Sequence, residues 1–340
     1  NRRERAIEYV KQALPLCHEV GDQQYEARLL LRQARHYGYP AAYARYNVVA
    51  EEFFQRALSL AREIKERGIE AQVLSDLGWY YFRIKHYEQG RARAEQALAI
   101  HREDKNKRAE ATMLNLLGTI SGSLGQYEKS VTHFEQGLVI HREVKNKTGE
   151  AHILSDLGYT HFLLGQYEKS LDCYRQSLAL IQEFKDQLSE AVVLSNIGEV
   201  FLKLGQLGKA REYLEQSRLV RREVRQTEFV PTLNLLGEVY RQQRQYEQAR
   251  NYYDQALALS RTVRDRQSEA DSLLHLALLY SDQRQYTKAQ ESLVQSLSLT
   301  RQIKERFNEG LALHQLMQVN ISLTRPSLAI FYGKQSVNTW

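Results

Sequence analysis

The stretch from Ala151 to Glu190, AHILSDLGYTHFLLGQYEKSLDCYRQSLALIQEFKDQLSE, decides the fold. It contains two segments in which small and apolar residues recur at i, i+3, i+4 and i+7, the spacing of a helix with one buried stripe. A turn at Gly165 separates the two segments. Gly158 in the first and Ser170 in the second are small where two closely packed helices leave no room for a side chain. The stretch therefore predicts a pair of packed helices.

The same unit recurs along the chain, so the pair is one member of an array. Its copies begin at Ala71, Ala111, Ala151, Ala191, Val230, Ala270 and Gly310. A period of about forty residues built from a helix pair is typical of a solenoid, in which each unit contacts only its neighbours. We expect a single array over residues 1–340. Its parts are the second helix of a truncated repeat (1–22), an irregular repeat with an insertion (23–67), regular repeats (68–306) and a divergent C-terminal repeat (307–340).

The repeated residues resemble the tetratricopeptide repeat. The pattern is carried by Leu74, Leu77, Gly78, Tyr81 and Tyr87, and again by Leu233, Leu236, Gly237, Tyr240, Tyr246, Ala249, Tyr253 and Ala256. The period of forty is similar to that of spindle-orientation adaptors, kinesin light chains and bacterial repeat arrays linked to CHAT protease domains. The resemblance implies an all-α, right-handed superhelix of about eight helix pairs that binds a protein or a peptide in its concave groove.

Two features of the ends suggest the setting of the array. The segment 327–338 resembles the sequence that precedes CHAT protease domains, and the chain opens within a helical pattern without an initiator methionine. We therefore expect a piece of a larger, bacterial signalling or effector protein, with self-association through the terminal repeats as a further expectation. Three roles stay open: a passive scaffold, a receptor for a short regulatory peptide, and the regulatory or sensor part of a CHAT-type enzyme whose catalytic domain lies outside this chain.

Composition favours a protein partner over nucleic acid or membrane. The chain has 47 basic and 41 acidic residues, a net charge of +6, and the two signs are interleaved, as on a solvated helix surface. No apolar run approaches the ~20 residues of a membrane span. Cys17 and Cys173 lie on apolar helix faces and read as core residues in a reducing, cytoplasmic protein.

The sequence contains no constellation that indicates catalysis. The Gly-Gln-Tyr turns join two helices, so they are not phosphate-binding loops, and the histidines lack metal-ligand spacing. Cys173 with His161 is the nearest approach to a nucleophile pair, but no orienting group is evident. We expect a non-enzyme without a cofactor or metal.

Candidate binding residues follow from their positions relative to the repeated glycine. In the first helix of each repeat, one set of positions faces the core. The positions three before, one after and four after the glycine form a second stripe, which in the resembled family lines the groove. Exposed aromatic residues at such positions would be informative, because they indicate a contact surface; the alternative is that they pack against the next turn of the superhelix. The expected peptide-binding residues are Ser75, Asp76, Trp79, Phe82, Asn115, Thr119, Ser155, Tyr159, Phe162, Ser195, Glu199, Leu202, Asn234, Glu238 and Arg241.

Two further features of the repeats carry expectations. An Asn or Asp followed by a Glu marks each regular inter-repeat turn (Asn106/Glu110, Asn146/Glu150, Asp186/Glu190), which predicts N-capping of the next helix. An insertion of four residues around Tyr37 to Ala42 breaks the spacing of the irregular repeat. It is either a protruding contact loop or packing over a helix end.

Overall fold

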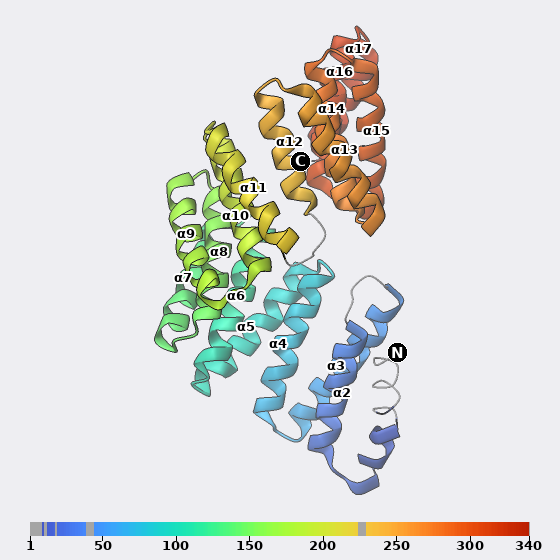
Figure 1. Ribbon diagram of the computed structural model, residues 1–340. Helices are drawn as coiled ribbons and strands as arrows, with labels where there is room; N and C mark the ends of the chain where they lie inside the picture. Colours follow the sequence, from blue (N-terminus) through green and yellow to red (C-terminus); the bar gives the residue numbers. More distant parts are fainter. Residues whose placement is uncertain (1–8, 10–11, 18, 39–43, 224–228, 340) are drawn as a thin grey trace. The chain divides into compact units, whose positions relative to one another are not determined.

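The computed structural model describes the chain except for residues 1–8, 10–11, 18, 39–43, 224–228 and 340. Within the described residues there is no strand, and helices follow one another in eight antiparallel pairs, from α2–α3 to α16–α17 (Figure 1). The all-α class and the solenoid of about eight helix pairs are thereby confirmed. Of the inserted loop, residues 39–42 lie outside the described residues.

Each pair consists of a first and a second helix. The first helices are α2 (Gln23–Gly38), α4 (Arg67–Arg83), α6 (Lys107–Ser123), α8 (Lys147–Leu163), α10 (Gln187–Lys203), α12 (Val230–Gln242), α14 (Arg266–Asp282) and α16 (Arg306–Ser322). The second helices are α3 (Ala44–Glu63), α5 (Tyr87–Glu103), α7 (Tyr127–Glu143), α9 (Tyr167–Phe184), α11 (Leu207–Glu223), α13 (Tyr246–Val263), α15 (Tyr286–Ile303) and α17 (Pro326–Thr339).

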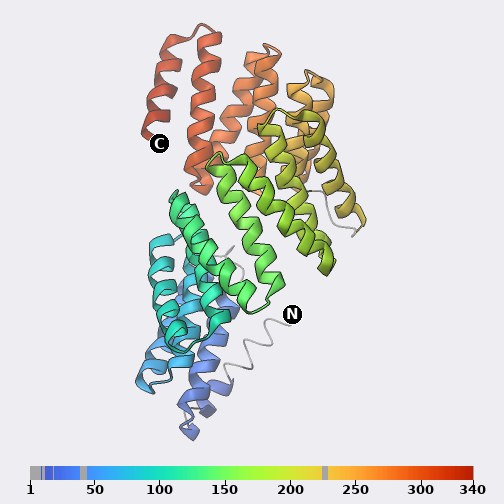
Figure 2. The same cartoon turned by 90° about the vertical axis from the view of Figure 1, so that its left-hand side faces the viewer.

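The chain forms two compact units, residues 1–180 and 181–340. In each unit the pairs stack in sequence order, which the turned view shows well (Figure 2). Within each unit, first helices contact the next first helix, as α4 contacts α6 and α12 contacts α14. Residues at equivalent positions of consecutive first helices therefore lie in a row along one face of each unit.

The turns between helices use two local devices. The predicted caps are present: the side chains of Asn106, Asn146 and Asp186 accept hydrogen bonds from the backbone amides three residues on. The first or second residue after a helix often has a positive φ, and several of these residues are lysine or arginine instead of glycine, such as Lys105 at 54°, two residues after α5 ends. A cation there also lies at the negative end of the helix dipole.

Small residues set the distance between helices in the core. Ala34, Ala94 and Ala97 in the first unit, and Ala249 and Ala289 in the second, are completely buried. At Gly118 and Gly237 the facing Phe134 and Tyr253 rings come so close that a Cβ would lie within 2.6 and 2.4 Å of them, respectively. The helix pairs are thus held together by aromatic rings that fit against bare backbone. Among the described residues, no helix is long and apolar enough to cross a membrane.

Candidate functional site

The candidate site lies on the first-helix face, by which we mean the side of the first helices that carries the positions three and two before, one after and four after the residue equivalent to Gly158. The equivalent residues are Ala34, Gly78, Gly118, Gly198, Gly237, Ala277 and Met317. In the first unit this face is formed by α2, α4, α6 and α8, and in the second by α10, α12, α14 and α16. Each unit is described separately.

Two aromatic clusters occupy the face of the first unit. Trp79 and Phe82 on α4 form an edge-to-face pair with ring centroids 6.0 Å apart, and Tyr87 extends the cluster at 5.9 Å from Phe82. On α8, Tyr159 stacks on Phe162 at 6.3 Å, and Tyr167 lies 5.9 Å from Phe162. Such ring pairs are stabilising by about 0.5–1.5 kcal/mol beyond the area they bury.

The two clusters differ in exposure. Trp79 and Phe82 are half-buried and pack on the core of the first unit. Phe162 is also half-buried, whereas half of the Tyr159 surface (50%) remains exposed. A large aromatic side chain that stays half exposed is the kind of anchor that protein interfaces use.

Between the clusters, α6 carries short side chains. Thr119 and Gly122 occupy the positions of Trp79 and Phe82, and the Thr119 hydroxyl donates to the Asn115 carbonyl at 2.9 Å. The face therefore alternates between an aromatic, a small and again an aromatic segment from α4 to α8.

The polar row three positions before each glycine is held by histidines of the second helices. The Ser75 hydroxyl donates to the Ala71 carbonyl at 2.8 Å and lies 3.1 Å from Nε2 of His101. The Asn115 side-chain amide lies 3.4 Å from Nε2 of His141. Burial lowers the pKa of both histidines, so they are neutral partners at pH 7. Ser155, the third member of the row in this unit, is half-buried.

Two aspartates lie at the same position of α4 and α8, two residues before the glycine, but only one of them has a cation partner. Asp76 accepts a hydrogen bond from Nε of Arg35 on α2 at 2.6 Å. Asp156 is exposed, and within the described part of the chain no hydrogen bond or ion pair reaches its carboxylate. Desolvation by the surrounding protein nevertheless raises the pKa of Asp156 to about 6.

In the second unit, several of the expected binding residues are buried. Ser195 and Asn234 are 2% and 5% exposed, and the Ser195 hydroxyl lies 3.0 Å from that of Thr232 on the next first helix. Leu202 is 5% exposed. Glu199 is half-buried, and burial raises the pKa of its carboxyl against the opposing effect of Lys203. This part of the row packs first helices together more than it offers contacts to a ligand.

The remaining two residues of the second unit belong to a charged cluster. Arg241 donates two hydrogen bonds to Glu238, at 2.8 and 2.7 Å, and a third to Asp282 on α14 at 2.5 Å. The Tyr253 hydroxyl donates to Glu238 at 3.2 Å, and Nδ1 of His275 lies 3.9 Å from the same carboxylate. The bonds from Arg241 hold the pKa of Glu238 below its usual value against the effect of burial. Burial lowers the pKa of His275 to about 4.

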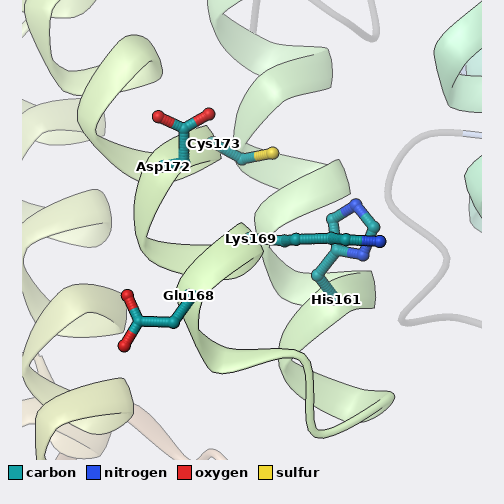
Figure 3. A pocket seen from close by; sticks show the side chains of 5 residues that line it. All are labelled: His161, Glu168, Lys169, Asp172 and Cys173. Carbon is teal, nitrogen blue, oxygen red and sulfur yellow. The ribbon is translucent and has the colours of Figure 1, made fainter.

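A pocket of about 410 Å³ lies beside His161 and four residues of α9, Glu168, Lys169, Asp172 and Cys173 (Figure 3). Nδ1 of His161 is 2.9 Å from the side-chain oxygen of Gln166, and no hydrogen bond between His161 and Cys173 is found. Burial, with the nearby Asp172, raises the pKa of the Cys173 thiol to about 11. A thiol in this state is a poor nucleophile, because the thiolate is the reactive form.

No group of three or more His, Cys, Asp or Glu side chains suited to a metal ion occurs among the described residues. The first helices α4, α6 and α8 of the first unit carry Ser75, Asp76, Trp79, Phe82, Asn115, Thr119, Ser155, Tyr159 and Phe162. The first helices α10 and α12 of the second unit carry Ser195, Glu199, Leu202, Asn234, Glu238 and Arg241. Sequence reasoning missed Arg35, Asp282 and the two histidines of the polar row. The two ion pairs join residues 41 positions apart, close to one repeat length, which is the signal that could have revealed them.

Similar structures come from several repeat proteins. A Rap protein complexed with Competence and Sporulation Factor aligns with a TM-score of 0.71 and 16% identity over 98% of this chain and 94% of that one. Aspartyl phosphate phosphatase F from Bacillus subtilis aligns with a TM-score of 0.64 and 18% identity, covering 85% of this chain and 75% of that one. The signal transduction ATPase PH0952 from Pyrococcus horikoshii, which has a tetratricopeptide repeat sensor, aligns at 0.63 and 12% identity, with 98% of this chain and 51% of that one covered.

Sequence comparison identifies the family directly. No curated protein matches the chain. The family model described as tetratricopeptide repeat matches residues 48–103, 109–183, 150–223, 189–262 and 228–302, which together span well over half of the chain. With the paired helices and the small residues at their crossings, this match shows that the chain belongs to the tetratricopeptide repeat family.

Proposed function

We propose that the chain is a non-catalytic binding module that holds a protein or peptide on the first-helix face of its first unit. The observation that carries this proposal is the pair of aromatic clusters on α4 and α8, of which Tyr159 remains 50% exposed. Aromatic anchors concentrate binding energy because they desolvate a large area at a low cost in conformational entropy.

The chemistry of the neighbouring side chains supports an extended ligand. Thr119 and Gly122 have small side chains, which leave space above α6 between the two clusters. Two ligand side chains could therefore contact the two clusters while the ligand backbone passes over α6. The similar Rap structure is described as a complex with Competence and Sporulation Factor, which agrees with a receptor for a short regulatory peptide. We favour this role over that of a passive scaffold.

A peptide selection tests the proposal. Random peptides displayed on phage are selected on the wild-type chain, and the affinities of the selected peptides are then measured for Phe82→Ala/Phe162→Ala. The double variant should lose at least ~2 kcal/mol of affinity, because hot-spot aromatic residues contribute on this scale. Leu219→Ala, which removes an exposed apolar side chain on α11 (57% exposed), is the matched control. Equal affinity for the double variant and the wild type would move the site elsewhere.

The setting that we propose is a larger bacterial, cytoplasmic signalling or effector protein. The ATPase PH0952, twice the length of its aligned part, is described as carrying such repeats as a sensor. The corresponding role here is to pass ligand binding on to a second domain, such as a CHAT-type protease domain.

Self-association through α17 is a second candidate function, favoured by a specific surface. Val337 is 76% exposed, although the equivalent Leu297 of α15 is 6% exposed where α16 covers it. At three further positions α17 has exposed apolar residues where α15 has polar ones. Leu328, Ile330 and Phe331 stand at the positions of Lys288, Gln290 and Glu291. We propose a second copy of the chain as the occupant, because Lys334 is the one charged residue of α17 and two such helices can face each other with little repulsion.

The oligomeric state tests this second candidate. Sedimentation velocity of the wild type should show a dimer that Ile330→Glu/Phe331→Glu converts into a monomer. Val294→Glu, at a comparably exposed site on α15 (45% exposed), should leave the dimer intact. A wild-type monomer at all concentrations up to about 100 μM excludes a dimer of micromolar affinity, about −8 kcal/mol, and contradicts the proposal.

A further inference from the structure

Two contacts between consecutive first helices of the second unit share one register, although the long Arg241 side chain reaches Asp282 by another. Glu238, one residue after its glycine, lies 3.9 Å from His275, two residues before the corresponding Ala277. Asp271 accepts a hydrogen bond from Asn308, which again stands 37 residues further along the chain. In both of these contacts, a side chain on one first helix meets the side chain three positions earlier in the next repeat.

The Arg35–Asp76 ion pair obeys the same register. Arg35 follows Ala34, the small residue of α2, and Asp76 precedes Gly78 by two residues. Their separation of 41 residues exceeds 37 by the four residues inserted between α2 and α3. The pair therefore shows which position of one first helix supplies the cation for the aspartate of the next.

Applied to α6 and α8, the register pairs Thr119 with Asp156. Thr119 is uncharged, so it cannot pair with Asp156 as Arg35 pairs with Asp76. Its hydroxyl donates to the Asn115 backbone carbonyl instead. The motif around Asp156, Ser-Asp-Leu-Gly-Tyr-Thr-His-Phe, otherwise repeats Ser-Asp-Leu-Gly-Trp-Tyr-Tyr-Phe around Asp76. The chain thus contains the same aspartate and aromatic set twice, once with an internal arginine and once without.

We propose that Asp156, with Thr119 and the rings of Tyr159 and Phe162, forms a subsite for an arginine side chain of the bound protein or peptide. This inference rests on the proposed function and deepens it, because it names one residue that the ligand must carry. The ligand's guanidinium would take the place at Asp156 that Arg35 takes at Asp76.

Three properties of the subsite favour a guanidinium. The Asp156 carboxylate offers two oxygen acceptors, which match the planar fork of N–H donors of a guanidinium. The stacked rings of Tyr159 and Phe162, one and two helical turns further along α8, can receive its planar, cationic face. Asp156 is also exposed, so a ligand can reach it, and the surrounding protein raises the pKa of its carboxyl to about 6, an effect that a bound cation would oppose.

The first test fills the subsite from within the chain. Thr119→Arg should form an ion pair with Asp156 that copies Arg35–Asp76, and should raise the thermal midpoint by roughly 2 °C over the neutral, similarly long Thr119→Gln. In an Asp156→Asn background the difference between arginine and glutamine should vanish, because their partner is absent. An equal difference in both backgrounds would overturn the assigned register.

The second test measures binding of a probe to the full chain. N-acetyl-arginine amide should give saturation-transfer NMR signals that saturate with concentration, and the neutral N-acetyl-citrulline amide should bind at least about tenfold more weakly, as expected for the loss of a charge-assisted hydrogen bond. Asp156→Asn and Thr119→Arg should each weaken arginine binding by a similar factor. Asp254→Asn, which removes an exposed carboxylate of α13 outside the first-helix face, should leave it unchanged.

The outcomes separate this subsite from the proposed function. Arginine binding that persists in both Asp156→Asn and Thr119→Arg overturns the subsite, whatever peptides the first-helix face selects. Selected peptides that depend on Phe82 and Phe162 but carry no arginine overturn the subsite and leave the proposed function standing. Arginine binding at Asp156 without any dependence of peptide affinity on Phe82 and Phe162 supports the subsite and contradicts the aromatic anchors.

Discussion

The ring of Tyr174 lies against the bare backbone of Gly158, so close that a Cβ at position 158 would lie 2.9 Å from two of its carbons. The contact joins α8 to α9 within one helix pair. It explains why the first helix carries glycine there while the second carries an aromatic ring: each is the shape that the other requires.

Substitution of this glycine should therefore destabilise the chain. We expect Gly158→Ala to cost on the order of 1–3 kcal/mol in the free energy of unfolding, because the Tyr174 ring must shift, as in other overpacked cores. Gly68→Ala on α4 is the matched control. No atom lies within 4 Å of a Cβ at Gly68, so alanine should stabilise the helix by up to about 1 kcal/mol. Urea denaturation of both variants measures the two effects, and a loss of stability in both would contradict this explanation.

The helix ends offer a second pair of opposite effects. Lys105 after α5 and Gly165 after α8 have the same left-handed backbone, with φ of 54° and 70°, and make equivalent backbone hydrogen bonds. Because glycine adopts this conformation without a Cβ penalty, Lys105→Gly should stabilise the chain by about 0.5–1 kcal/mol and Gly165→Lys should destabilise it by a similar amount. Thermal denaturation at high salt, where the helix dipole is screened, provides the measurement. An unchanged midpoint in both variants would mean that the strain is relieved elsewhere.

Arg241 should be the most sensitive arginine on the first-helix face of the second unit. Its side chain is 19% exposed and neutralises both Glu238, which is 13% exposed, and Asp282. Arg241→Met leaves these carboxylates without their cation, which should cost about 3–5 kcal/mol. Arg250→Met breaks an exposed pair with Asp254 at 3.6 Å and should cost no more than about 1 kcal/mol. Comparable losses for both variants would show that the buried cluster contributes no more than a surface pair.

The repeat pattern predicted most of the fold because the residues that determine each helix pair recur at the same positions in every repeat. The small crossing residues, the Asn and Asp caps and the turn positions follow from residues near one another in the chain, such as Asn146 and the amide of Gly149. The candidate site was less predictable, because its state depends on contacts between repeats. Asp76 and Asp156 have the same neighbours in sequence, yet only Asp76 faces an arginine from the preceding first helix. Burial of Ser195 and Asn234 likewise results from the packing of neighbouring first helices.

Asp271 gives the chain a pH dependence of definite sign. Burial, with the nearby Glu305 and Asp265, raises the pKa of Asp271 to about 7, from 3.8 for an unperturbed carboxyl. Between these two values the folded chain binds a proton that the unfolded chain does not, so the contribution of Asp271 to stability falls as the pH rises from about 4 to 7. Asp271→Asn removes this contribution. Its thermal midpoint, compared with that of the wild type, should therefore be relatively higher at pH 7.5 than at pH 5. A constant difference between the two midpoints across this range would contradict the raised pKa.

The two equivalent aspartates of the first unit should respond to the same substitution with opposite signs. Asp76→Asn removes the acceptor of the Arg35 ion pair, so it should lower the thermal midpoint at pH 7.5. Asp156→Asn removes a carboxylate that has no cation partner and whose pKa the surrounding protein raises to about 6, so it should raise the midpoint at the same pH. Because protonation removes the unfavourable charge of Asp156, the gain should disappear between pH 6 and pH 4, below the raised pKa of about 6. Differential scanning calorimetry at pH 7.5 and pH 4 measures both effects in the same chain. Destabilisation by Asp156→Asn at pH 7.5 would show that this carboxylate already has a partner, and would leave no room there for a ligand's arginine.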